Sequence, residues 1–240
     1  EIPACAPIVF PDGDSLHDVE GIAYAVWPRV GGRSPDELSD EDVEILGRLV
    51  ARIHNVGAAR NVVARPTLGA QRDARESLAF LEERGFLPAR VAARYRSAVE
   101  RVAARYDDVS RRVPEFRIHG DCHHGNLLRG RSGWFFLDFD DFVLGPAVQD
   151  VWMLLPGRDE EADRQRDVFI EAYQTFRAFE PQWLALVEPL RALRYIRYTA
   201  WIARRWDDPS FPQHFPHFGT DRYWEQETID LEEQLERISR

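Results

Sequence analysis

Apolar residues recur at intervals of three and four through most of this chain after Ser39, the spacing that gathers them on one face of an α-helix. Ser39, with Asp42 three residues later, is close to a capping box and marks where the first helix should begin. The stretches that we predict as helices are 39–57, 71–84, 89–108, 147–155, 159–178, 183–206 and 221–238. The pattern therefore predicts a mainly helical body.

One island of β-like sequence interrupts these helices. Leu127-Leu128 and 134–137 are predicted to pair as a short hairpin across a turn at 130–133. The segment 206–216, which is rich in proline and aromatic residues, is predicted as a rigid surface loop between two helices.

The N-terminal region has a different pattern from the rest of the chain. It predicts strands at 7–10 and 22–27, and glycines and a proline in 30–35 indicate a linker. We therefore expect residues 1–30 to form a remnant of a small sheet-containing lobe and residues 31–240 to form a helical lobe.

Composition limits the class of protein. The chain has 240 residues, of which 44% are hydrophobic and 30% charged, a profile of a folded globular protein. The sequence contains neither a run of 18 apolar residues nor a secretory signal at its start, so a cytoplasmic protein is expected. Its net charge of −10 should repel nucleic acid and anionic lipid. We expect a monomer without nucleic-acid or membrane partners.

The most informative stretch runs from Arg117 to Asn126, followed across the predicted hairpin by 137–141. His119, Asp121 and Asn126 have the spacing of a kinase catalytic loop, H-x-D-x-x-x-x-N, and Asp138 follows where a metal-binding aspartate is expected. A zinc cluster of Cys122 with His119, His123 and His124 is disfavoured, because adjacent histidines cannot easily face one metal ion.

Phosphoryl transfer explains why these residue types belong together. It needs a carboxylate to receive the proton of the acceptor hydroxyl, and a cation to neutralise the phosphates. Asp121 is our candidate catalytic carboxylate. Asn126 and Asp138 are the candidate ligands of Mg²⁺, a hard cation that prefers oxygen donors.

The segment His119-Gly120-Asp121-Cys122-His123-His124-Gly125-Asn126 resembles the signature of the aminoglycoside phosphotransferase and choline kinase superfamily. Stretches at 24–33, 145–155, 188–192 and 201–212 resemble one member in particular, the stress response kinase A family of bacterial Ser/Thr protein kinases. The resemblance runs from about residue 6 to residue 235.

This resemblance implies an α+β, protein-kinase-like fold that uses ATP and Mg²⁺. It also implies that Trp27, Pro28 and Val30 belong to a hinge that meets the adenine, and that Asp150 braces the catalytic loop. The expected acceptors are Ser and Thr hydroxyls of proteins, the enzyme itself included.

Two features depart from the family pattern. The chain contains no Lys and no G-x-G-x-x-G loop, although a kinase small lobe uses such groups to hold ATP. The sequence is therefore read as a fragment of a longer protein that does not phosphorylate anything alone, with a natural non-catalytic remnant as the other interpretation. A small-molecule kinase acting on an aminoglycoside, amino alcohol or sugar stays open as an alternative.

Overall fold

The computed structural model describes residues 2–60, 64–131 and 133–239. The chain forms two compact units, each assembled from separate segments. Unit 1 comprises 1–63, 116–142 and 149–179, and unit 2 comprises 64–115, 143–148 and 180–240. The sequence predicts a boundary near residue 30, between a small lobe and a helical lobe. That boundary is not the one between these two units, and it stays a prediction.

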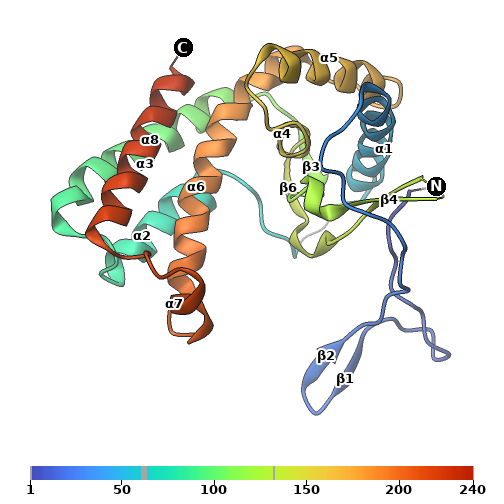
Figure 1. The fold of residues 1–240 in the computed structure, drawn as a ribbon, viewed down its shortest axis with the longest axis horizontal. Helices are drawn as coiled ribbons and strands as arrows, with labels where there is room; N and C mark the ends of the chain where they lie inside the picture. Colours follow the sequence, from blue (N-terminus) through green and yellow to red (C-terminus); the bar gives the residue numbers. More distant parts are fainter. Residues whose placement is uncertain (1, 61–63, 132, 240) are drawn as a thin grey trace. The chain divides into compact units, whose positions relative to one another are not determined.

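Two helices, α1 (Asp40–Ala58) and α5 (Glu160–Gln174), lie side by side in unit 1 (Figure 1). The predicted capping box is confirmed, since the Ser39 side chain accepts from the Asp42 N–H and the Asp42 carboxylate accepts from the Ser39 N–H. Gly47 permits the close approach, because a Cβ there would lie 2.6 Å from the Phe169 carbonyl oxygen.

The predicted central hairpin is confirmed in unit 1. It consists of β4 (Leu127–Gly130) and β5 (Gly133–Phe136), paired antiparallel with Leu127 opposite Phe136. The N-terminal part of the chain flanks this hairpin, because Phe136 donates its N–H to the Pro3 carbonyl and Arg33 exchanges backbone hydrogen bonds with Arg129. The short strand β3 (Glu115–Ile118) leads into the loop that precedes the hairpin.

The N-terminal strands differ from the prediction. The paired strands are β1 (His17–Val19) and β2 (Ile22–Tyr24), joined by a two-residue turn in which Glu20 and Gly21 both have positive φ, 55° and 82°. Such turns match the twist of a hairpin. The segment 7–10 is not a strand, since Phe10 bonds back to Asp14 and only Ile8 pairs, with Val26.

Unit 2 is helical, as predicted, with some boundaries displaced. The expected helix at 71–84 is a π-helical turn, η1 (Ala70–Arg75), continued by α2 (Glu76–Glu83), and α3 (Ala89–Ser110) follows. The expected helix at 183–206 begins as the 3₁₀ turn η4 (Pro181–Leu186) and continues as α6 (Val187–Arg204).

The core of unit 2 lies among α3, α6 and α8 (Asp221–Ile238) (Figure 1). Its centre holds the buried rings of Tyr95 and Trp224, which meet edge to face at 5.7 Å between ring centres. On the surface, Arg94 bridges Glu225 and Glu232 and so ties α3 to α8.

The predicted loop at 206–216 contains a helix, α7 (Ser210–His214). The Asp208 carboxylate accepts from both the N–H and the hydroxyl of Ser210, the first residue of this short helix. In the part of the chain that the structure describes, none of the helices is sufficiently long and apolar to span a bilayer.

The remaining elements are short. They are the 3₁₀ turns η2 (His124–Asn126) and η3 (Phe139–Asp141), the strand β6 (Val143–Pro146) and the helix α4 (Val148–Leu154).

Candidate active site

The hairpin register brings the two predicted metal ligands together. Asn126 directly precedes β4 and Asp138 follows β5 by two residues, and Leu137 donates its N–H to the Asn126 carbonyl at 2.9 Å. Residues 12 positions apart are therefore neighbours at the open end of the hairpin. This is the arrangement that the sequence spacing predicts.

Asp150 holds the loop before the hairpin by its backbone. The fully buried carboxylate accepts from the N–H of His119 at 2.9 Å and from the N–H of Gly120 at 2.8 Å. The bracing role implied by the family resemblance is thus confirmed. Gln149, beside it on α4, adds a hydrogen bond from its side-chain amide to the Gly120 carbonyl.

The charge of Asp150 is compensated inside the fold. Burial alone would raise the pKa of this carboxyl, but the hydrogen bonds that it accepts from His54 and from the Gly120 N–H outweigh burial and lower it. Asp150 is accordingly an ionised acceptor for the loop.

His54, on the buried face of α1, was missed by sequence reasoning. Its Nε2 lies 2.8 Å from Asp150 Oδ2 and its Nδ1 lies 2.8 Å from the Tyr173 hydroxyl on α5. With Nε2–H donating to the carboxylate, Nδ1 accepts from the phenol, so Tyr173 fixes the tautomer. The only available signal was a histidine among the apolar residues of a predicted helix.

His119 links the loop to the strand that carries Asp138. Its Nε2–H donates to the Leu137 carbonyl at 2.8 Å, its Nδ1 faces the Asp121 N–H, and its ring lies 4.6 Å from that of Phe139. The histidine is buried and acts as a brace.

Asp121 is partly buried at the centre of this arrangement. The Asn126 amide nitrogen lies 2.9 Å from the Asp121 carbonyl and 3.4 Å from its carboxylate. His123 accepts the Gly125 N–H on Nδ1, so its Nε2 carries the proton and meets the Asp121 carboxylate at 3.3 Å. The carboxylate is therefore held in place and still reached by solvent.

Asp138 has a left-handed backbone, with φ 57° and ψ 61°. This conformation costs a residue with a Cβ about 1–2 kcal/mol, although aspartate tolerates it better than most. Strain of this kind persists where the surrounding structure enforces it, and it often accompanies function. Here it turns the chain sharply after β5 and leaves the carboxylate exposed.

Asp138 lines a pocket of about 580 Å³ within unit 1, a volume in the range of small-ligand sites. Trp27, Pro28 and Val30, the predicted hinge residues, line the same pocket, as does Asp140. Asp141 is exposed.

The donor set suits a hard cation. The amide nitrogen of Asn126 donates a hydrogen bond to the Asp121 carbonyl, so its amide oxygen is the atom available to a metal ion. The Asp138 carboxylate is the second such donor. Both donors are oxygens and neither is a thiolate or imidazole, which favours Mg²⁺ over Zn²⁺.

Comparison with known proteins identifies the group to which this arrangement belongs. A sequence model of the phosphotransferase enzyme family, APH, matches residues 1–187. The chain belongs to this phosphotransferase family. Within the family it is 38% identical over 235 residues to stress response kinase A of Escherichia coli K12, and 37% identical to a protein of Salmonella typhimurium named serine/threonine protein kinase RdoA. These alignments cover 98% of this chain and 71% of each relative.

Solved structures confirm the phosphotransferase fold. The amicoumacin kinase hAmiN superposes with a TM-score of 0.68 at 17% identity, covering 97% of this chain and 73% of that one. A microcompartment-associated aminopropanol kinase superposes with a TM-score of 0.65, also at 17% identity, over all of this chain and 76% of its own. The predicted kinase-like fold is therefore correct, and the family relationship supports an ATP-dependent phosphotransferase.

Proposed function

We propose that this phosphotransferase is a Ser/Thr protein kinase that uses Mg·ATP. The observation that carries the proposal is the meeting of Asp121, Asn126 and Asp138 beside the pocket lined by the hinge residues. The acceptor class is supported by the names of the relatives at 37–38% identity. We also propose a cytoplasmic monomer without nucleic-acid or membrane partners.

In this proposal Trp27, Pro28 and Val30 contact the adenine, and Asn126 and Asp138 hold the metal. Bound Mg²⁺ supplies neutralisation of the phosphate charge. The acceptor hydroxyl forms its bond to the γ-phosphorus while its proton passes to the Asp121 carboxylate and ADP leaves. His119, His54 and Asp150 touch no reactant and serve to position the loop.

A small-molecule kinase is the second candidate. A net charge of −10 favours the approach of a cationic acceptor such as an amino alcohol or an aminoglycoside. Transfer to a protein hydroxyl and transfer to a small molecule need the same Asp121, so only the labelled product separates them.

The test uses the full product of the gene and labelled ATP, offered separately to a mixed protein substrate and to a panel of amino alcohols and aminoglycosides. We expect label on Ser and Thr, and a fall in turnover of about 10²-fold or more in Asp121→Asn, on the order of a lost general base, with little change in Mg·ATP affinity. Label confined to a small molecule would reject the protein-kinase assignment, and unchanged turnover in the variant would reject Asp121.

A further inference from the structure

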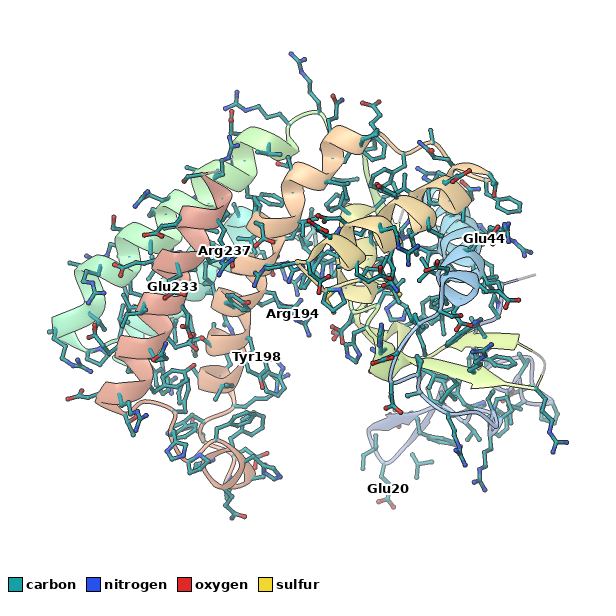
Figure 2. The ribbon with its side chains drawn as sticks, turned by 45° about the horizontal axis from the view of Figure 1, so that its top comes forward. Glu20, Glu44, Arg194, Tyr198, Glu233 and Arg237 are labelled. Carbon is teal, nitrogen blue, oxygen red and sulfur yellow. The ribbon has the colours of Figure 1, made fainter. Side chains whose placement is uncertain are left out.

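A row of aromatic side chains lies on the surface of unit 2, outside the site described above. Tyr195, Tyr198 and Trp201 of α6 are 42%, 50% and 38% exposed. Figure 2 shows Tyr198 on the side of α6 that faces away from α8. Large aromatic side chains gathered on a surface are typical of interaction sites, because leaving them in water is unfavourable.

The row is ordered by contacts among its own members. The rings of Tyr198 and Trp201 stack at 5.7 Å with planes only 8° apart. From α7, Phe211 packs 5.2 Å from Trp201, and Phe215 lies 6.3 Å from Tyr198. Because the rings brace one another, binding a partner costs little additional side-chain entropy.

Apart from Glu188 in its first turn, the charged residues of α6 are all arginines. Between Pro189 and Trp206 the sequence has five Arg and no Asp or Glu, although the whole chain has a net charge of −10. Arg205 is exposed and its guanidinium lies 4.5 Å from the centre of the Trp201 ring. Arg194 lies on the same side of α6 as Tyr198 (Figure 2).

The acidic residues that follow α6 are engaged locally. Asp208 accepts from the backbone N–H and the hydroxyl of Ser210, which lowers the pKa of its carboxyl, and Asp207 lies 3.6 Å from Arg84. Charges are screened over about 8 Å at physiological salt, so a ligand at the row senses these arginines more than the distant acidic surface.

We infer that this aromatic and arginine surface binds an acidic segment of the protein substrate. The surface is formed by Tyr195, Tyr198, Trp201, Arg205, Phe211 and Phe215. Guanidinium groups pair with carboxylates through two parallel hydrogen bonds, and the rings accept the apolar side chains between them. A segment in which Asp or Glu alternates with apolar residues fits both features. This inference rests on the proposed protein-kinase function and names its substrate class.

Binding without nucleotide tests the surface separately from catalysis. Fluorescence anisotropy on this chain would use a labelled Ser-containing peptide with four Glu and two Leu, and the same peptide with every Glu replaced by Gln. We expect the acidic peptide to bind about tenfold or more tightly, and raised salt to reduce the difference. Equal affinity for the two peptides would overturn the inference.

Three variants locate the site. Arg205→Glu should weaken binding of the acidic peptide about tenfold, and so should the double variant Tyr198→Ala with Trp201→Ala. Arg105→Glu changes an exposed arginine on α3 and should leave this binding unchanged. Circular dichroism confirms that each variant folds. Binding that survives both surface changes, or that Arg105→Glu weakens equally, would reject this surface.

Two further measurements decide between occupants. Tighter binding of a single-stranded oligonucleotide than of the acidic peptide, or self-association that Tyr198→Ala with Trp201→Ala abolishes, would also overturn the inference. Acidic-peptide binding at this surface without any phosphorylation of protein would reject the kinase proposal and leave the surface standing, so the two failures are distinguishable.

Discussion

His54 Nε2 lies 2.8 Å from Asp150 Oδ2, although the two residues are 96 positions apart in the chain. Both side chains are fully buried, and Asp150 in turn holds the backbone N–H groups of His119 and Gly120. Helix α1 therefore supports the loop that contains Asp121 through a buried carboxylate.

The first prediction concerns His54→Ala. It leaves the Asp150 carboxylate buried without its side-chain partner, so the free energy of unfolding should fall by about 3–5 kcal/mol. Urea unfolding measures this loss. The control is His214→Ala, which removes an exposed histidine and should cost less than about 1 kcal/mol. Equal losses in the two variants would show that the buried pair of His54 and Asp150 contributes no more to stability than an exposed histidine does.

The second prediction concerns pH. The pKa of Asp150 in the folded protein lies below its ordinary value of 3.8, so its stabilising contribution is present above about pH 4 and is lost as pH falls through the lowered pKa. Asp150→Asn removes this contribution. The free energy of unfolding should therefore depend less on pH below 4 in the variant than in the wild type.

Other carboxyls do not confuse this comparison. Arginine partners also lower the pKa values of Asp40 and Glu232, but both remain in the two proteins and contribute equally to each acid profile. Parallel pH profiles for wild type and Asp150→Asn, measured by urea unfolding between about pH 2 and 5, would contradict the assignment.

Local signals predicted much of this fold. The Ser39 capping box, the hairpin at 127–136 and the spacing of Asp121, Asn126 and Asp138 each depend on residues close in sequence, and all three arrangements are found as expected. Helix α7 was missed because its surroundings are rich in proline and its N-cap residue, Pro209, makes no side-chain capping hydrogen bond.

Contacts between distant segments could not be read in the same way. Tyr173 reaches His54 over 119 positions because α1 packs on α5, and His54 reaches Asp150 of α4 over 96 positions. The pairing of His17–Val19 with Ile22–Tyr24 depends on a left-handed Glu20, a conformation that glutamate rarely adopts. Such features require the three-dimensional arrangement.

The third prediction concerns Asp138→Asn and tests the proposed metal site. Asparagine tolerates the left-handed backbone at this position, so the variant removes the charge with little change in fold. Loss of a charged oxygen ligand should weaken the Mg²⁺-dependent part of ATP binding about 10-fold or more. Calorimetric titration with ATP, with and without Mg²⁺, measures this. Asp141→Asn is the control, and an equal effect there would argue against a ligand role for Asp138.

The fourth prediction concerns Gly57, near the end of α1. A Cβ at this position would lie 1.9 Å from the carbonyl oxygen of Arg117, two residues before His119. Backbone atoms on both sides must move to relieve such a contact, so Gly57→Ala should destabilise the protein by about 2 kcal/mol or more.

This expected loss opposes the ordinary effect of the same substitution. Within a helix, Gly→Ala normally adds about 1 kcal/mol of stability, because alanine has the better helix propensity. Gly31→Ala is the matched control, since a Cβ there would meet nothing within 4 Å, and its effect should stay within about 1 kcal/mol. Urea unfolding of both variants measures the difference. A stabilised or unchanged Gly57→Ala would mean that α1 does not approach Arg117 this closely, and that the loop after Arg117 does not depend on this contact for its position.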